Sequence, residues 1–391
     1  MKVLISTFSF PPERDGVAEA SATCAHIFRR TGWSVEVVTS RLATARSSVD
    51  WHGVDGHEFA ISGTPHYRQP YRGQLDSYRS FLLAGKWDII FFQGYSWPLD
   101  LAVPLLDCIS AKKVLVSHGY GALIWTPVSQ FPFGLGALAF SAARSLRMLR
   151  WIKKIDRWVF LSHQTDLRSF YDHWLAQKIH HPGIRVISNG LDPTQRGVGS
   201  RFRESLGIAN DVLLFLCVGY FSRGKNQKMA LQAYRQAALP NSRLVFIAPE
   251  CNAWMERCQE ADLAYPSPAA NSGVLWLTKL SREMTLDSFS AIDIYLSSSL
   301  GETQPISILE AMREFKPWIA LRAGCISEFR GGLCVSSLRE MVLAIRRLGT
   351  NPEERRTLGQ AGRQAVESKY SMDRLDSAYC QLVEQLVSER S

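Results

Sequence analysis

Two glutamates, eight positions apart, stand in the segment GETQPISILE: Glu302 and Glu310. The segment follows an apolar run, Ile294–Ser297, that is typical of a strand. Pro305 favours the first turn of a helix, where a missing N–H costs no hydrogen bond. We therefore expect Glu302 in the loop before a helix and Glu310 inside it. A carboxylate accepts two hydrogen bonds from a vicinal diol, and the N–H groups at a helix start suit a phosphate or sugar oxygen.

A second segment, VGYFSRGKN, brings two cations to a junction between a strand and a helix. The predicted strand is Leu213–Val218 and the predicted helix is Gln227–Gln236. Arg223 and Lys225 lie between them, where side-chain charge and the helix dipole together can hold a diphosphate. The alternative is an ordinary exposed basic loop.

Two positions near the N-terminus could also do chemistry. Gly16, in the segment FPPERDGV, allows a loop to approach a phosphate closely, although a turn glycine before a helix fits equally well. His118, in the segment SHG, ends a predicted strand and carries a side chain suited to chemistry near neutral pH. A structural histidine is the alternative.

Short apolar runs alternate with helix-length segments along the whole chain, which predicts parallel sheets covered on both faces. A length of 391 residues favours two domains. We expect an N-terminal domain over 1–192, a C-terminal domain over 193–371 that begins with a linker reaching Arg203, and a final helix over 372–391 that can cross back to the first domain. Ligands of such sheets bind beyond the carboxyl ends of the strands. The strands are expected at Val3–Ser6, Val35–Thr39, Ile89–Phe92, Val114–Ser117, Trp158–Ser162, Leu213–Val218, Arg243–Ile247, Val274–Leu277, Ile294–Ser297 and Trp318–Leu321.

These motifs, in this order, resemble the retaining glycosyltransferases of family four, which carry an E-x7-E motif. The resemblance covers nearly the whole chain, including the segments IRVISNGLD and KPWIALRAGCISEF. It implies an α/β fold of the GT-B type, with two doubly wound Rossmann-like domains facing a central cleft. The N-terminal domain would bind the acceptor and the C-terminal domain a sugar nucleotide.

Carried over from the family, the residue roles divide between catalysis and donor binding. Glu302 lies by the donor sugar, Glu310 binds the ribose hydroxyls, and Lys225 matches the family lysine. Tyr220 stands where the family has an arginine, and Arg223 can supply the missing charge. The full predicted set is catalytic His118, Glu302, Lys225 and Arg223, and donor-binding Gly16, Tyr220, Thr303, Gln304, Pro305, Ile306 and Glu310. The family usually has Phe-Gly where this chain has Gln304 and Pro305, which marks an atypical branch.

The implied reaction moves a hexosyl group from a nucleoside diphosphate to an acceptor hydroxyl, with retention and without a metal or other cofactor. No DxD motif is present, so protein cations would neutralise the diphosphate. Cell-surface polysaccharide or glycolipid assembly is the expected setting, with a lipid-linked or saccharide acceptor. A sugar-nucleotide epimerase or a sugar-phosphate synthase of the same fold is the alternative. A dinucleotide-dependent oxidoreductase would need a G-x-G-x-x-G motif, which neither Gly16 nor Gly119 belongs to.

The charge of the chain adds two expectations about partners and location. A net charge of +9 favours anionic partners, but no nucleic-acid-binding module is recognisable. A basic stripe with interleaved aliphatic residues predicts either a helix that lies on an anionic membrane surface or an ordinary solvated helix face. The stripe comprises Arg144, Arg147, Arg150, Lys154 and Arg157, with Leu146, Leu149, Ile152 and Ile155 between them and Trp125, Phe131, Phe133 and Phe140 upstream.

The eight cysteines form no CxxC pair, which predicts buried reduced thiols and a cytosolic protein. The first residues, Met1–Ser6, run directly into a strand pattern and not into a signal peptide. No apolar run approaches the length of a membrane span. We therefore expect a cytoplasmic protein that can be peripheral on the cytoplasmic membrane face.

Overall fold

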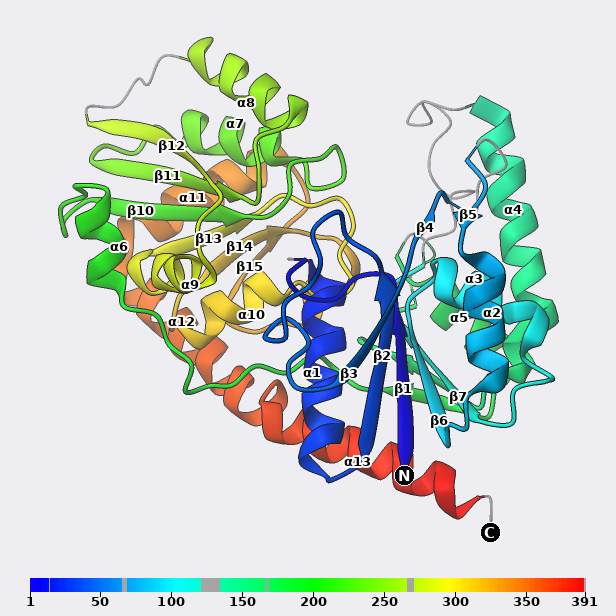
Figure 1. The fold of residues 1–391 in the computed structure, drawn as a ribbon. Coiled ribbons are helices and arrows are strands. Elements are labelled where there is room, and N and C mark those ends of the chain that lie inside the picture. The colour runs from blue at the N-terminus through cyan, green and yellow to red at the C-terminus, as the bar shows by residue number, and fades with distance from the viewer. Residues whose placement is uncertain are drawn as a thin grey trace. The chain divides into compact units, whose positions relative to one another are not determined.

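The computed structural model describes residues 1–13, 15–64, 69–120, 134–165, 167, 169–265 and 271–389, with the side chains of 134–141 and 144 excepted. The chain divides into two compact units. Unit 1 consists of Met1–Asn189 with Asp376–Ser391, and unit 2 consists of Gly190–Leu375. Each unit is built on its own parallel sheet (Figure 1).

The sheet of unit 1 has the strand order β3-β2-β1-β6-β7-β8-β9, and all its pairings are parallel. Its strands are β1 (Lys2–Thr7), β2 (Ser34–Ser40), β3 (Asp55–Phe59), β6 (Ile89–Gln93), β7 (Lys112–Ser117), β8 (Arg157–Phe160) and β9 (Ile184–Val186). A small antiparallel pair, β4 (Ile61–Ser62) with β5 (Arg72–Gly73), lies outside this sheet.

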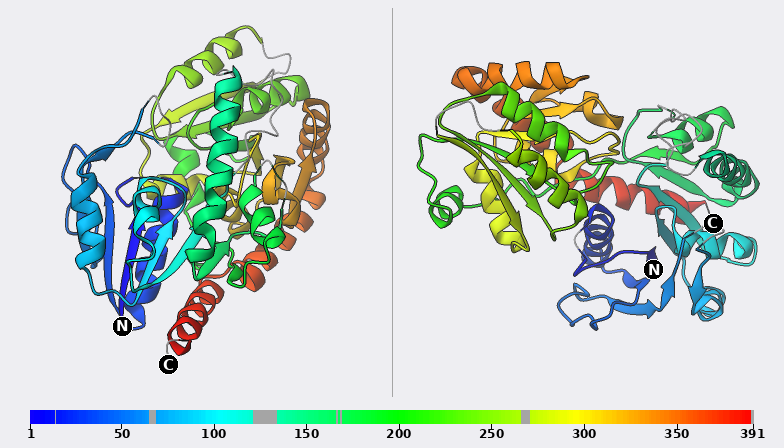
Figure 2. Two further views of the ribbon diagram at one scale, coloured as in Figure 1. Left: turned by 90° about the vertical axis from the view of Figure 1, so that its right-hand side faces the viewer. Right: turned by 90° about the horizontal axis from the view of Figure 1, so that it is seen from above.

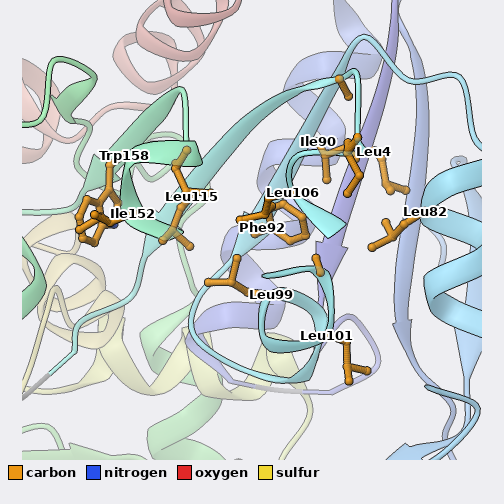
Figure 3. Packing of buried hydrophobic residues seen from close by; sticks show 14 of the residues in the cluster. Leu4, Leu82, Ile90, Phe92, Leu99, Leu101, Leu106, Leu115, Ile152 and Trp158 are labelled. Atoms are coloured by element: carbon orange, nitrogen blue, oxygen red, sulfur yellow. The ribbon is translucent and has the colours of Figure 1, made fainter. Parts of the chain in front are cut away.

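Alternate side chains of the central strands enter two apolar layers, because helices cover both faces of the sheet. Leu4, Ile90 and Phe92 enter a core shared with α2 and α3 (Figure 3). Phe91 points the other way and packs against Phe28 of α1, with ring centroids 4.8 Å apart. The helices are α1 (Gly16–Arg30), α2 (Leu75–Ala84), α3 (Trp97–Ala102), α4 (Gly134–Trp151) and α5 (Tyr171–Lys178), with short 3-10 turns η1 (Val103–Leu105) and η4 (Ile152–Lys154).

The last helix, α13 (Met372–Ser388), contributes its residues from 376 onward to unit 1. Tyr379 of α13 lies against Phe28 of α1 and Phe91 of β6. The right-hand view of Figure 2 shows α13, in red, beside α1, in dark blue. Unit 1 is therefore assembled from the first half of the chain and its final helix.

The sheet of unit 2 has the strand order β12-β11-β10-β13-β14-β15. Its strands are β10 (Leu213–Val218), β11 (Ser242–Ala248), β12 (Ser272–Thr278), β13 (Ile294–Ser297), β14 (Trp318–Leu321) and β15 (Gly332–Val335). Its helices are α6 (Gly199–Ser205), α7 (Gln227–Ala237), α8 (Ala253–Leu263), α9 (Arg282–Ala291), α10 (Ile306–Arg313), α11 (Leu338–Thr350) and α12 (Pro352–Lys369), with the 3-10 turn η5 (Gly324–Glu328). Helices α7 and α11 pack together on one face, and α9, α10 and α12 lie on the other (Figure 1). The predicted α/β class with two doubly wound domains is confirmed.

Three predictions about local structure are wrong in part. The linker expected to reach Arg203 contains the helix α6, because the buried Arg203 side chain donates to the carbonyl oxygens of Ala291 and Ala209 and so fixes this segment. The cysteines are all free, but Cys108 and Cys251 are exposed.

The basic stripe is also interrupted. Helix α4 ends at Trp151, and Arg157 belongs to β8, where its guanidinium pairs with Glu389, the residue directly after α13. Lys154, in η4, pairs with Asp107. Of the aromatic residues upstream, Trp125, Phe131 and Phe133 and the side chain of Phe140 lie outside the described residues, as does the side chain of Arg144. Among the helices that the structure describes, none is long and apolar enough to cross a membrane.

Candidate active site

The candidate site in unit 2 lies where the strand order of the sheet reverses. The chain adds strands on one side of β10 through β11 and β12, and on its other side from β13 onward. Loops that follow two strands flanking such a point lie next to each other and form a ligand-binding crevice at the carboxyl edge. The loop after β10 carries Lys225, and the loop after β13 carries Glu302.

Two hydrogen bonds join these two loops, one between main-chain groups and one from a serine side chain. The N–H of Leu300 donates to the carbonyl oxygen of Gly224 at 2.8 Å, and the hydroxyl of Ser298 donates to the carbonyl oxygen of Asn226, also at 2.8 Å. Within the first loop, the N–H of Lys225 donates to Ser222 Oγ at 3.2 Å. The loop after β10 is thus stabilised by a hydrogen bond within the loop and by hydrogen bonds to the loop after β13.

Lys225 and Glu302 form an ion pair, with Nζ 2.6 Å from Oε1. The Glu302 side chain is 11% exposed and the Lys225 side chain 41%. The Glu302 carboxylate is therefore nearly buried, while the Lys225 side chain reaches solvent.

Two buried neutral groups, Cys217 and Tyr295, lie close enough to the pair to interact with it electrostatically. Burial raises the pKa of the Cys217 thiol, at the end of β10, to about 12, and the Lys225 charge opposes this only in part. Burial likewise raises the pKa of Tyr295 well above its ordinary value, and its hydroxyl contacts Val218 O at 3.4 Å and the Ser307 hydroxyl. Neither of these two groups ionises near neutral pH.

The helix α10 begins at Ile306, with Pro305 as its N-cap residue in an extended conformation. This agrees with the expected helix start at the proline, with Glu302 before the helix and Glu310 within it. Gln304 and Pro305 are buried, and Thr303 and Ile306 are half-buried. A side chain at Gly301 would meet nothing within 4 Å, so the backbone before the helix is open to approach.

Glu310 is buried in α10, with a side chain only 4% exposed, and it pairs with Arg282 at the start of α9. Sequence reasoning did not identify Arg282. The sequence signal that could have identified it is its position. It lies four residues beyond the end of β12 and is the first residue of the next helix. The buried guanidinium of Arg313 also lies close enough to Glu310 to interact electrostatically.

Arg223, the second cation of the loop, and Tyr220, which replaces the arginine of the family pattern, both face the solvent. Arg223 is exposed in the turn that contains Lys225. Tyr220 is 50% exposed, and its carbonyl oxygen accepts a hydrogen bond of 2.9 Å from Gln227 Nε2. The loop therefore presents Arg223 and Tyr220 outward while its backbone is fixed from below.

In unit 1, His118 and Gly16 follow strands at the corresponding edge of the sheet. His118 comes directly after β7, is half-buried, and its Nε2 lies 2.9 Å from Gln93 Oε1. Burial lowers the pKa of His118 to about 4, with the Asp15 carboxylate opposing the change. The imidazole is consequently neutral at pH 7.

Gly16 is the first residue of α1, and a Cβ on it would meet nothing within 4 Å. The preceding Asp15 caps the helix, because its Oδ1 accepts from the N–H groups of Val17 and Ala18 at 2.8 and 2.9 Å. Asp15 Oδ2 accepts from Ser9 Oγ at 2.5 Å. The Asp15 carboxylate thus caps the N-terminus of α1. This helix-capping role explains why an aspartate stands next to Gly16, although the loop was predicted to bind phosphate.

The structure brings together Lys225 with Glu302, and Glu310 with Arg282, in unit 2, and it places His118 and Gly16 in unit 1. In the parts of the chain that the structure describes, no group of three or more His, Cys, Asp or Glu side chains is placed to hold a metal ion.

Residues 213–351, which include β10 to β15 and both glutamates, match the family described as glycosyl transferases group 1. No curated protein matches the chain closely enough in sequence to count as a relative.

Solved structures match the chain over nearly its full length. Sucrose-phosphate synthase from Thermosynechococcus elongatus superposes with a TM-score of 0.79 at 16% identity, covering 99% of each chain. Anabaena HepE in complex with UDP-glucose superposes with a TM-score of 0.76 at 15% identity. The match covers 99% of this chain and 100% of the HepE chain. WaaG, a glycosyltransferase involved in lipopolysaccharide biosynthesis, superposes with a TM-score of 0.70 at 14% identity. The match covers 96% of this chain and 98% of the WaaG chain.

The matched domain and the GT-B fold of these neighbours together support a glycosyltransferase. The predictions of the fold class and of the enzyme class are confirmed.

Proposed function

We propose that this chain is a retaining, metal-independent hexosyltransferase with an E-x7-E donor site, which moves a hexosyl group from a nucleoside diphosphate to an acceptor hydroxyl. The observation that carries the proposal is the Lys225–Glu302 pair at the strand-order reversal of the domain that matches the group 1 glycosyl transferases. A cation and a carboxylate in contact suit a substrate that joins an anionic diphosphate to a hydroxyl-rich sugar.

Each charged group has a role in this reaction. Glu302 accepts hydrogen bonds from donor-sugar hydroxyls, and Glu310 accepts from the ribose hydroxyls while Arg282 holds its other side. Lys225 and Arg223 neutralise the diphosphate as its bond to the sugar breaks, which is when its negative charge grows. Gly16 is assigned to the β-phosphate and His118 to the donor sugar.

Retention follows in this proposal from attack on the face that the leaving group departs from. The departing phosphate then helps to deprotonate the acceptor hydroxyl, so no carboxylate nucleophile is required. Because protein cations balance the diphosphate charge, no divalent cation is needed.

The HepE structures hold UDP-glucose, or UDP with glucose, and this makes uridine diphosphate sugars the first donors to test. The acceptor is a lipid-linked or free saccharide, in cell-surface polysaccharide or glycolipid assembly, at the cytoplasmic membrane face. Helix α4 supports this location, since Leu146 (65% exposed) and Leu149 (42% exposed) alternate there with the exposed Arg147 and Arg150. Apolar side chains flanked by basic ones suit an anionic lipid surface.

The test has two parts. UDP-, GDP- and dTDP-sugars are screened for protection against thermal unfolding, where a ligand at 100 times its Kd adds about 2.7 kcal/mol. The stabilising donor is then incubated with saccharide and glycolipid acceptors, and the anomeric configuration of the product is read by NMR. An inverted product would reject the retaining mechanism. Isomerisation of the donor without an acceptor, or transfer to a sugar phosphate alone, would favour an epimerase or a sugar-phosphate synthase.

A further inference from the structure

A row of buried polar side chains leads from α13 to His118 inside unit 1. The Tyr379 hydroxyl lies close to the Cys24 sulfur. Gln93 Nε2 donates to the same sulfur at 3.5 Å, and Gln93 Oε1 lies 2.9 Å from His118 Nε2. Tyr379, Cys24 and Gln93 are 3%, 2% and 1% exposed, so water does not compete for these contacts.

The direction of the hydrogen bond between Gln93 and His118 follows from the two ends of the amide. A glutamine amide donates through its nitrogen and only accepts through its oxygen. Because the Gln93 nitrogen faces the Cys24 sulfur, its oxygen faces the imidazole. Nε2 of His118 must then carry the hydrogen, which leaves Nδ1 as the accepting nitrogen of the neutral ring.

The sulfur that orients the amide is itself held in place. Cys24 lies in α1, and burial raises its pKa to about 11, so it remains an uncharged thiol at neutral pH. Tyr379 is fixed beside it by edge contacts with Phe28 and Phe91, whose ring centroids lie 5.9 and 6.0 Å away. Helix α13 thereby supplies a second group beside the sulfur.

We propose that Gln93 is a positioning residue, held by Cys24 and Tyr379, that keeps His118 in its neutral Nε2–H tautomer with Nδ1 as a hydrogen-bond acceptor. The proposal rests on the role given above to His118. It deepens that role because a ring in this tautomer accepts hydrogen bonds at Nδ1 and does not donate there. Whatever group of the donor or acceptor sugar meets Nδ1 is consequently a hydroxyl that donates.

The charge on the ring is part of the same arrangement. Burial lowers the pKa of His118 to about 4, and the carboxylate of Asp15, before α1, is the charged group that opposes this. An amide partner adds no charge, whereas a carboxylate at position 93 would stabilise the imidazolium form.

The tautomer is measured directly by long-range ¹H–¹⁵N correlation spectra of the full chain labelled on histidine. The protein has nine histidines, and His118→Asn identifies the signals of interest. We expect the Nε2–H pattern for His118 at pH 7, persisting down to about pH 5. An Nδ1–H pattern in the unmodified protein would overturn the proposal, because it would mean that the Gln93 amide is reversed.

Variants at Gln93 separate positioning from simple packing. Gln93→Glu keeps an acceptor opposite Nε2, so we expect the Nε2–H tautomer to remain and the pKa of His118 to rise by about one to three units. Gln93→Met removes the acceptor, so Nδ1–H should become populated. Gln177→Met is the matched control, since exposed Gln177 contacts a different ring, His173 Nε2, at 3.4 Å. Unchanged His118 signals in both Gln93 variants would contradict the proposal.

These spectra do not depend on transferase activity. The tautomer assignment can therefore fail while the proposed transferase function stands, and the transferase function can fail while the tautomer assignment stands. In an active preparation, Gln93→Met should lower kcat more than Gln93→Glu does at pH 7. Equal loss in both would show that residue 93 acts only through packing.

Discussion

The N–H of Leu300 donates to the carbonyl oxygen of Gly224 at 2.8 Å, and this single backbone bond joins the loop that carries Lys225 to the loop that carries Glu302. The ion pair between these two side chains therefore does not rely on flexible side chains alone. Both charges are held at one place by main chain that leaves the sheet from neighbouring strands.

Arg223 and Lys225 lie in one turn, and we expect both to stabilise the departing diphosphate. Arg223→Ala should lower kcat by more than it raises the donor KM, because the interaction strengthens as the bond breaks. A loss of roughly 3 kcal/mol of transition-state stabilisation is expected for a charged donor in such a site. Steady-state kinetics beside Lys225→Ala checks this. An Arg223→Ala enzyme near wild type, with Lys225→Ala inactive, would make Arg223 a surface residue.

Glu310→Ala should raise the donor KM and weaken binding of the free nucleoside diphosphate, because the ribose is bound alike before and during the reaction. The buried Glu310 also pairs with Arg282, so Arg282→Ala should share part of this effect. Titration calorimetry with the nucleotide measures both. Glu283→Gln, an exposed neighbour of Arg282 that pairs with Arg201, is the control. Unchanged nucleotide affinity in Glu310→Ala would remove Glu310 from the site.

Activity should persist in excess EDTA, since Lys225 and Arg223 are assigned the task that a divalent cation performs in metal-dependent enzymes. Initial rates are compared before and after chelation, and after adding Mg²⁺ or Mn²⁺. A rate lost on chelation and restored by either ion would reject the metal-independent assignment.

Asp172 predicts a specific pH dependence of stability. Burial raises the pKa of this carboxyl to about 6 from its ordinary 3.8, although Ser117 and Tyr95 donate hydrogen bonds to it. The folded state then binds more protons than the unfolded state between these values, so the free energy of unfolding falls as the pH rises through this window. By linkage the fall amounts to about 3 kcal/mol above pH 6.

Asp172→Asn cannot ionise, so its stability relative to wild type should improve between pH 4 and pH 7 by up to that amount. Urea unfolding at both pH values measures the difference. Asp107→Asn, at an exposed carboxylate, is the control. A constant difference between Asp172→Asn and wild type would show that Asp172 is already ionised at low pH.

The exposed face of α4 should bind anionic vesicles. Arg147→Gln with Arg150→Gln should reduce co-flotation with phosphatidylglycerol vesicles, because each basic residue near such a surface contributes about 1 kcal/mol. Arg356→Gln with Arg374→Gln removes the same charge from exposed positions on α12 and α13. Equal binding by the two double variants would make the face of α4 an ordinary solvated surface.

Much of the fold can be read from the chain because its strands are continuous apolar runs. The strands at Leu213–Val218, Ile294–Ser297 and Trp318–Leu321 have the predicted bounds, since both their faces are buried. The edge strands β3 and β15 were not predicted. β3 reads DGHEF, which lacks the apolar or β-branched pattern of a central strand. β15 reads GLCV, a short apolar run that follows Gly331 and begins at Gly332, and such glycines indicate a turn more than a strand.

The candidate site could be predicted only where a local motif exists. Glu302, Glu310 and Lys225 stand out through spacing and through their place after strands. Arg282 and Gln93 do not, because each meets its partner only through tertiary contacts, 28 and 25 residues along the chain. The basic stripe misled for a related reason, since Arg157 continues the helical spacing but enters β8, where the sheet requires a strand.

The contribution of residues 376–388 to unit 1 has a consequence for synthesis on the ribosome. These residues emerge after all of unit 2. Unit 2 can form its core while Phe28 and Phe91 of unit 1 are not yet covered by Tyr379. Unit 1, most of which precedes unit 2 along the sequence, is therefore completed after unit 2, in contrast to the usual order in which the domain made first folds first.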